Sequence, residues 1–600
     1  MARQLVSVLL LATAACATPA PATPPPAPQP SLRQAPEPPP ASPDLSPIGA
    51  PASLVLVARA NREAFERLSF ALPRAPVETL PLGLEELLTD APVELAVALD
   101  SPEALLAGEP DWVWSLPVAS FEGALALLRE RERRDDLALE RRSPGVVVVS
   151  VRADPQAGTC WLAASLGPAP ARIVCSPRKG ALEVLGAYAA RGLPTRAFGP
   201  GLLAVEATPA RFAREHREKL AGLLRFAVPS PARRWTDAGA SVLGADALDL
   251  LVDTQRASLS VAVSGTGLSA ELALELDGQR SWLSRTVASL PPRSAGIGEL
   301  FARLPESTDA AFFFTGAAPA RTDEARAAFT DWLAAELGPS APRATLELVA
   351  STFIQRSPHL YAHGDAYGKD AGVSLRTGRS LWEHTRSTYG WHVIGFDEPA
   401  RNFVPRLDQG MRAYNAGSLR DFAYRTLPRL CAGLGKIKKR GAAPGLPRGS
   451  SIYELPLPGK FFDDCMRGAA SAPDPAPNDA IVVVLMPIGE RTFIGFGLDE
   501  RSMVERMKGL SRAPGARPTP PLLGAPDVRL GGFISLSGVA GLMRFLTMEE
   551  RWEWRRSRWA SKPNGGNAGS PFSLSVTSAG VTRVIGRLDV DARTLADLRD

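Results

Sequence analysis

Two stretches of the sequence share one pattern, and this pattern restricts the fold more than any other feature of the chain. Ala257–Leu276 reads ASLSVAVSGTGLSAELALEL, and Phe572–Leu588 reads FSLSVTSAGVTRVIGRL. In both, apolar and polar residues alternate before and after a glycine turn, which is typical of a β-hairpin with one buried face. Gly580 stands in the place of Gly267. The sequence therefore predicts a repeated unit built on an antiparallel sheet.

The repeat predicts a boundary near Pro291–Glu299 and two related modules, residues 52–295 and 296–600. Each module opens with an apolar strand, Ser53–Ala58 in the first and Ala310–Thr315 in the second. Amphipathic helical segments follow these strands. The expected fold class is therefore α+β, with two modules of mainly antiparallel sheet and packed helices. A chain of 600 residues, 45% of them apolar, is large enough to bury a core in each module.

Helical spacing predicts two longer helices in the first module. Phe121–Arg142 starts with apolar residues and continues into a mixed charge run, which indicates one helix with a solvated end. Thr208-Pro209 starts a second helix, with Phe212 and Leu220 on its apolar side. His216 falls on the polar side of that helix, where a solvated histidine is the simplest interpretation.

Four of the five cysteines suit two disulfides. Cys160 and Cys175 flank two short predicted strands around a Gly/Pro turn, so a hairpin there brings them opposite each other. Cys431 and Cys465 enclose a Gly-, Pro- and Lys-rich segment. Proximity favours the pairs 160–175 and 431–465 over the other pairings. Four reduced thiols are the alternative.

The first sixteen residues, MARQLVSVLLLATAAC, have the basic, apolar and small-residue order of an export signal. They resemble the signals of bacterial lipoproteins, in which a lipobox precedes a cysteine that is diacylated before cleavage. Residues 14–16 match this pattern, whereas Thr13 stands where the family usually has Leu. The resemblance implies an acylated Cys16 and, because Ala17 follows it, an outer-membrane lipoprotein facing the periplasm or the surface. Conventional cleavage after Ala14, giving a soluble periplasmic or secreted protein, is the alternative.

Residues 17–51 consist mainly of Pro, Ala, Thr and Ser, with almost no large apolar side chain. Such a segment buries too little surface to offset the entropy of ordering, so it predicts a disordered, polyproline-like linker. At ~3.1 Å per residue, this linker is long enough to hold a folded body up to ~100 Å from a lipid anchor. The expected partner of the N-terminus is therefore a membrane.

The charges of the chain do not indicate a nucleic-acid partner. The sequence has 68 basic and 63 acidic residues, and its net charge is only +5. An excess this small produces no field that would recruit a polyanion.

One histidine region is a candidate metal site. His359 and His363 stand four residues apart, and Asp365 follows, so two imidazoles and a carboxylate are available as zinc ligands. Pro358 and Gly364 argue against a helix, and on a strand the two histidines would share one face. Histidines satisfied by hydrogen bonds are the alternative. The chain has no Gly-x-Ser-x-Gly elbow, and its motifs predict no catalytic residue and no cofactor.

The segment RWEWRRSRW, residues 551–559, is a candidate binding surface for anionic lipid or a glycan. Interleaved arginines and tryptophans supply charge and interfacial ring contacts. The alternative is a helix end whose tryptophans pack inward, because the neighbouring glutamates dilute the positive field. The candidate residues are Arg551, Trp552, Trp554, Arg555, Arg556 and Trp559.

The sequence thus predicts an exported, lipid-anchored cell-envelope protein with a non-catalytic binding or scaffolding role. An envelope protein, a lipid or a glycan is the expected partner of the folded body. The layout resembles that of uncharacterised bacterial envelope proteins with tandem α+β modules, a resemblance that implies no activity. The alternative function is a metal-dependent envelope hydrolase that uses the His359, His363 and Asp365 region.

Overall fold

The structure is a computed structural model of the whole chain. It describes residues 49–61, 88–102, 110–134, 136–152, 158–164, 170–199, 201–227, 236–265, 267–289, 300–304, 308–337, 342–364, 391–417, 420, 435–456, 480–497, 500–512, 528–536, 538–539, 572–579, 582–592 and 594. The predicted signal, the linker up to residue 48, Cys431, Cys465, Asp365 and residues 551–559 lie outside these ranges.

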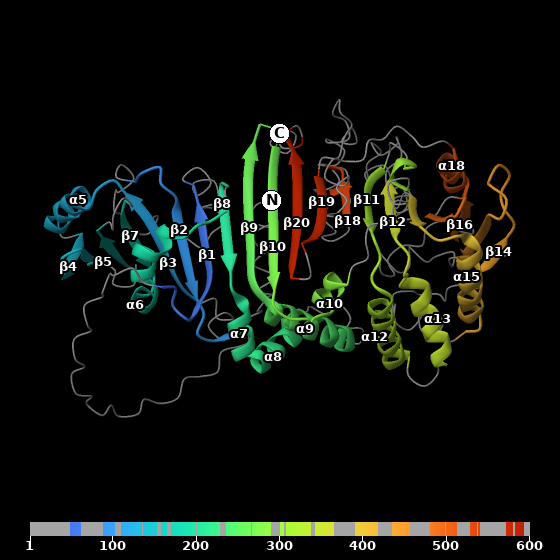
Figure 1. The fold of residues 1–600 in the computed structure, drawn as a ribbon, viewed down its shortest axis with the longest axis horizontal. Helices are drawn as coiled ribbons and strands as arrows, with labels where there is room; N and C mark the ends of the chain where they lie inside the picture. Colours follow the sequence, from blue (N-terminus) through green and yellow to red (C-terminus); the bar gives the residue numbers. More distant parts are fainter. Residues whose placement is uncertain are drawn as a thin grey trace, which may run out of the picture. The chain divides into compact units, whose positions relative to one another are not determined.

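The predicted α+β class is confirmed, because helices and antiparallel strand ladders make up the described part of the chain (Figure 1). The chain divides into two compact units. Unit 1 comprises residues 1–231, 240–263 and 272–277, and unit 2 comprises residues 232–239, 264–271 and 278–600. The predicted module limits 52–295 and 296–600 stay a prediction. In the structure, residues 264–271 of one hairpin belong to unit 2, while the residues on both sides of them belong to unit 1. Unit 2 then continues after Asp277.

The first half of the chain forms ten described strands and five α-helices. They are β1 (Leu54–Ala60), β2 (Val93–Ala98), β3 (Asp111–Val118), α5 (Phe121–Arg133), β4 (Leu137–Ser143), β5 (Val146–Val151), β6 (Thr159–Ala163), β7 (Ala171–Ser176), α6 (Lys179–Ala187), β8 (Leu203–Ala207), α7 (Pro209–Glu215), α8 (Arg217–Ala227), α9 (Thr236–Asp253), β9 (Thr254–Ser264) and β10 (Gly267–Leu276).

The second half also forms ten described strands. Its elements are α10 (Trp282–Ala288), β11 (Thr308–Phe314), α12 (Pro319–Leu337), α13 (Arg343–Phe353), β12 (His359–Gly364), β13 (Trp391–Phe396), α15 (Ala400–Asn415), β14 (Lys438–Arg440), β15 (Ser451–Pro456), β16 (Ala480–Ile488), β17 (Arg491–Gly497), α18 (Glu500–Ser511), β18 (Val528–Ile534), β19 (Phe572–Ala579) and β20 (Arg583–Asp591).

The two units have the same strand order. In the first, the neighbours run β4-β5-β6-β7-β3-β2-β1-β8-β9, and β9 also pairs with β10. In the second, they run β14-β15-β16-β17-β13-β12-β11-β18-β19-β20. Adding ten to each strand number converts the first order into the second. The hairpins that match in sequence, β9/β10 and β19/β20, are thus also equivalent in topology.

An irregularity of the sheet recurs at the same place in both units. The pairing of β1 with β2 skips Val55, and the pairing of β11 with β12 skips Asp309. After β8 and β18, the backbone N–H of Thr208 donates to the carbonyl of Val55 at 2.8 Å, and that of Ser535 donates to the carbonyl of Asp309 at 2.6 Å. Bulges are conserved features of related sheets, so this match supports two modules of common origin.

Among the described elements, helices pack on both faces of the strand ladder in each unit. In unit 1, α6 covers a core that includes Val57, Val113 and Trp161, while α5 covers the opposite core around Leu128 and Ile173. Gly186 allows α6 to approach the sheet, because a Cβ at this position would lie 2.6 Å from the ring of Trp161.

In unit 2, α18 and α15 take the corresponding places. The buried side of α18 consists of Met503, Val504, Met507 and Leu510, as its spacing indicates. Phe403 of α15 packs on the other face, against Phe396. None of the described helices is long and apolar enough to cross a membrane.

The prediction of one helix over Phe121–Arg142 is wrong in its second half. The helix α5 ends at Arg133, and residues 137–143 form the edge strand β4. Pairing explains the difference, because Leu137 is buried opposite Val151 while the charged residues 140–141 face solvent. Ladder hydrogen bonds and burial of Leu137 outweigh the local helical pattern of the charge run.

Candidate functional site

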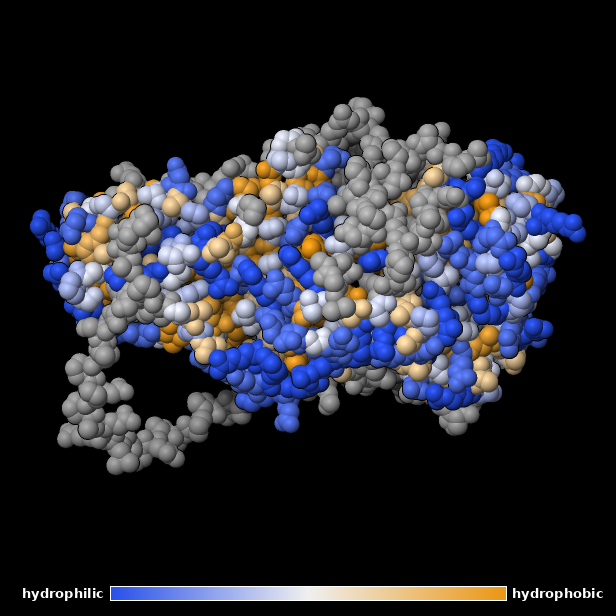
Figure 2. Space-filling view, in the orientation of Figure 1, coloured by the Kyte–Doolittle hydropathy of each residue, from blue (hydrophilic) through white to orange (hydrophobic). Residues whose placement is uncertain are grey.

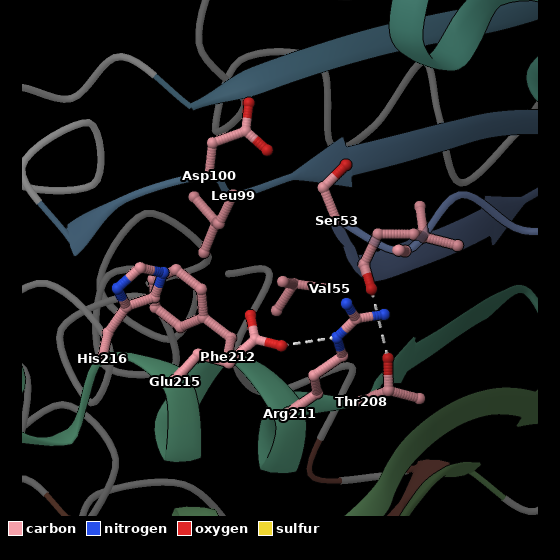
Figure 3. Close-up of a pocket in the computed structure, with 11 residues that line it drawn as sticks. Ser53, Val55, Leu99, Asp100, Thr208, Arg211, Phe212, Glu215 and His216 are labelled. Carbon is pink, nitrogen blue, oxygen red and sulfur yellow. Dashed lines mark hydrogen bonds and ion pairs between the residues drawn. The ribbon is translucent and has the colours of Figure 1, made fainter.

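A small pocket lies in unit 1 where β1 begins, β2 ends and α7 follows β8 (Figure 3). Its volume is about 210 Å³. Its lining comes from three parts of the chain: Ala52, Ser53, Leu54, Val55, Leu99, Asp100, Thr208, Arg211, Phe212, Glu215 and His216.

Backbone hydrogen bonds hold these three segments together. The N–H of Leu99 donates to the carbonyl of Ser53 at 3.0 Å, which joins the end of β2 to the start of β1. Thr208 uses both its groups on β1, because its N–H donates to Val55 and its hydroxyl donates to the carbonyl of Leu54 at 3.3 Å. Pro209 then fits the first helical turn, where no N–H partner is needed. The bulge at Val55 therefore forms part of the pocket wall.

His216 interrupts the helix that the sequence predicts. It has φ −115° and ψ 22°, so α7 ends at Glu215 and α8 starts at Arg217. The imidazole lies beside the ring of Phe212, four residues earlier, and the two ring centroids are 4.8 Å apart. Figure 3 shows these two rings together on one flank of the pocket. His216 is half-buried, and solvent reaches part of its side chain.

Among the charged side chains that line the pocket, one carboxylate forms no ion pair with another described residue. Arg211 Nε donates to Glu215 Oε1 at 2.7 Å on the exposed side of α7. This hydrogen bond lowers the pKa of the Glu215 carboxyl. Asp100, exposed after the end of β2, has no ion-pair partner among the described residues. Two carboxylates and one guanidinium therefore line the pocket.

The surface beyond the pocket is polar. Arg217, Glu218 and Lys219 lie on the first turn of α8, and Figure 2 shows a hydrophilic surface where Figure 1 places this helix. Leu220 faces inward and packs with Leu248 and Val252 of α9. The helices beside the pocket are thus amphipathic, with a hydrophilic outer side.

The predicted disulfide between Cys160 and Cys175 is confirmed. The two residues are register partners on β6 and β7, their sulfur atoms are 2.06 Å apart, and each is at most 1% exposed. Cys16, Cys431 and Cys465 lie outside the described residues.

The histidines of the candidate metal site lie on one face of β12 but do not meet. His359 and His363 are four residues apart on a strand, which separates their Cα atoms by about 13 Å. Side chains on a strand stand roughly perpendicular to the sheet, so these two imidazoles do not converge on one ion. In the parts of the chain that the structure describes, no group of three or more His, Cys, Asp or Glu side chains is arranged to hold a metal. Asp365 lies outside the described residues.

Each histidine has neighbours of its own. His363 lies opposite His392 of β13, with ring centroids 5.8 Å apart, and Tyr361 Oη lies 2.8 Å from His392 Nδ1. His359 Nδ1 contacts the carbonyl of Ser357 at 3.2 Å. Burial lowers the pKa of His359, although this carbonyl opposes the shift.

The pocket was not predicted from the sequence. Its residues are separated by up to 164 positions, from Ala52 to His216, and none of them forms a motif. The available signals were local ones: the Thr-Pro start of α7, and a histidine directly after a helical acid.

No family model matches the sequence, and the search of curated proteins found no match. The search of solved structures found two crystal forms of TP0453. Form III is 10% identical and covers 41% of this chain and 88% of that chain, with a TM-score of 0.20. Form I is 11% identical and covers 41% and 87%, with a TM-score of 0.21. A likeness at this level carries no argument about fold or function.

Proposed function

We propose that this chain is an exported cell-envelope protein, anchored in the outer membrane through acylated Cys16, that binds a partner without catalysing a reaction. The buried Cys160–Cys175 disulfide is the observation that carries the proposal. Disulfides of this structural kind form and persist in oxidising compartments outside the cytosol. The lipoprotein-like signal at residues 1–16 supplies the route to such a compartment.

The pocket of unit 1 supports the binding role. It combines apolar walls, two adjacent rings and charged groups, which is the usual composition of a small-molecule or side-chain site. The hydrolase alternative needs two imidazoles on one ion, whereas β12 holds His359 and His363 apart. The binding role therefore has a geometric basis in the described structure, and the hydrolase role has none there.

The N-terminal peptide provides the test of export and anchoring. The full chain and a Cys16→Ser variant are expressed in a bacterium with an outer membrane, and both are fractionated. We expect a diacylglyceryl mass on Cys16 in the membrane fraction, and a shift of the variant to the soluble fraction. A mature peptide that starts at Ala15 would refute the anchor. An intact Met1 would refute export.

The state of Cys160 and Cys175 in the same cells provides a second test. Acid quenching followed by alkylation under denaturing conditions counts the free thiols. We expect the Cys160–Cys175 peptides to be disulfide-linked, while a chain lacking residues 1–16 keeps both thiols reduced in the cytosol. Reduced cysteines in the exported chain would remove the main support for the proposal.

A further inference from the structure

We propose that the pocket of unit 1 binds an organic cation, namely an ammonium or guanidinium group on a short aliphatic stem. This proposal adds a ligand class to the binding role proposed for the chain and rests on that role alone. It requires neither export nor an acylated Cys16.

Charge is the first argument for a cation. Arg211 is already neutralised by its hydrogen bond to Glu215 at 2.7 Å. Asp100 remains as a carboxylate at the pocket with no ion-pair partner among the described residues. An incoming ammonium or guanidinium group would pair with Asp100, whereas an anion would have to approach this unpaired carboxylate.

The rings of Phe212 and His216 are the second argument. Their centroids are 4.8 Å apart, and Figure 3 shows them on one flank of the pocket, with Leu99 and Asp100 on the strand end beside them. A cation placed against the Phe212 face is attracted by the ring quadrupole. Leu54, Val55 and Leu99 provide apolar surface for an aliphatic stem.

Size restricts the ligand further. A volume of about 210 Å³ lies below the ~300–1,000 Å³ of pockets that hold drug-sized molecules. It suits a group as large as the end of an arginine or lysine side chain. An ammonium or guanidinium group of this size is found both in a free small amine, such as a diamine, and in a basic side chain of a partner protein. A probe with blocked backbone groups and a probe with a free amine distinguish these two sources.

The equivalent place in unit 2 carries different side chains. Asp309 takes the place of Val55, and Ser535 takes the place of Thr208. The hydroxyl of Ser535 donates to Asp309 Oδ1 at 3.1 Å, and both residues are buried. The apolar side chain at this position is therefore a feature of unit 1, whereas unit 2 has a buried acid there.

Isothermal titration calorimetry with a matched pair of probes tests the proposal. The full chain carrying Cys16→Ser is titrated with N-acetyl-arginine amide and with N-acetyl-citrulline amide, which has nearly the same shape but no charge. We expect the arginine probe to bind about fivefold more tightly or better, and its affinity to fall with added salt. Agmatine, which has one free amine and one guanidinium group, represents the small-molecule source. If agmatine binds and the blocked arginine does not, the source is a free amine and not a protein side chain.

Variants locate the binding. Asp100→Asn should weaken the arginine probe about threefold to fivefold, while Asp136→Asn, at an exposed site between α5 and β4, should leave its affinity unchanged. Phe212→Leu should also weaken it, and thermal unfolding checks that each variant is folded. Equal binding of the citrulline probe, tighter binding of N-acetyl-glutamate amide, or an unchanged affinity of Asp100→Asn would overturn the proposal. The lipid and thiol measurements are separate, so failure here leaves the proposed export and anchoring untouched.

Discussion

Val55 and Asp309 occupy the same place in the two units, since each is the residue skipped by a bulge in the first strand of its sheet. Each also accepts a hydrogen bond from the first residue after an equivalent strand, Thr208 or Ser535. One side chain is apolar and lines a pocket, and the other is acidic and buried in a hydrogen bond. The shared backbone thus carries different chemistry in the two units.

The glycine at the start of β10 provides a test of how closely this hairpin turn approaches β20. Gly267 has φ +142°, and a Cβ there would lie 2.0 Å from the carbonyl oxygen of Val590. Gly267→Ala should therefore lower the free energy of unfolding by about 1–3 kcal/mol or more. Gly265→Ala is the matched control, because a Cβ at Gly265 meets nothing within 4 Å. Urea unfolding measures both, and equal stabilities would contradict the close approach to β20.

The disulfide should stabilise unit 1 by about 3 kcal/mol, since it joins residues 15 positions apart. The double variant Cys160→Ala/Cys175→Ala removes the bridge without leaving a free thiol. We expect its unfolding midpoint in urea to fall, and addition of reductant to change the wild type but not the variant. A variant as stable as the oxidised wild type would show that the bridge contributes nothing.

Glu94 is a buried carboxylate between two arginines. Its side chain is 0% exposed, and it pairs with Arg59 at 2.6 Å and with Arg172 at 3.3 Å. Burial raises the pKa of Glu94, against the opposing effect of the two arginines. Glu94→Gln leaves Arg172, 4% exposed, without its counter-charge and should lower the free energy of unfolding by about 3–5 kcal/mol.

The exposed pair of Glu130 on α5 and Arg134, directly after this helix, provides the control for Glu94. Glu130→Gln should change the free energy of unfolding by less than about 1 kcal/mol, because solvent screens this pair. Chemical denaturation of both variants makes the comparison, and similar losses of stability would contradict the role of burial.

The positions of unit 2 that are equivalent to Arg59 and Glu94 are apolar. Phe313 lies opposite Leu360 on its first two strands, so the same topology also tolerates an apolar core at this place.

His359 should make unit 2 less stable in mild acid. Burial lowers its pKa in the folded chain below the ordinary value near 6.5, so the unfolded chain takes up the proton first as the pH falls. The free energy of unfolding should therefore decrease from about pH 6.5 downward, until the pH reaches the folded-state pKa. His359→Gln removes this proton uptake. Denaturation at about pH 7.5 and about pH 5.5 should give a smaller pH difference for the variant, and identical differences would refute the prediction.

Several features of this protein follow from local sequence patterns. Alternation of apolar residues around Gly267 predicts the β9/β10 hairpin, and the Gly/Pro turn between Cys160 and Cys175 predicts a hairpin that brings them together. Helical spacing in α18 predicts its buried methionines. Such patterns suffice because neighbouring residues along one element share its period and therefore its buried face.

Other features depend on contacts between segments that are distant in the chain. The charge run after Arg133 becomes the strand β4 because β5 offers it a ladder, not because of its own propensity. The pocket brings Ser53, Asp100 and His216 together from three separate segments of the chain, and no spacing along the sequence encodes that meeting. Periodicity therefore specifies which face of an element is buried, whereas register between elements specifies which side chains meet, and the chemistry of the candidate site depends on the second.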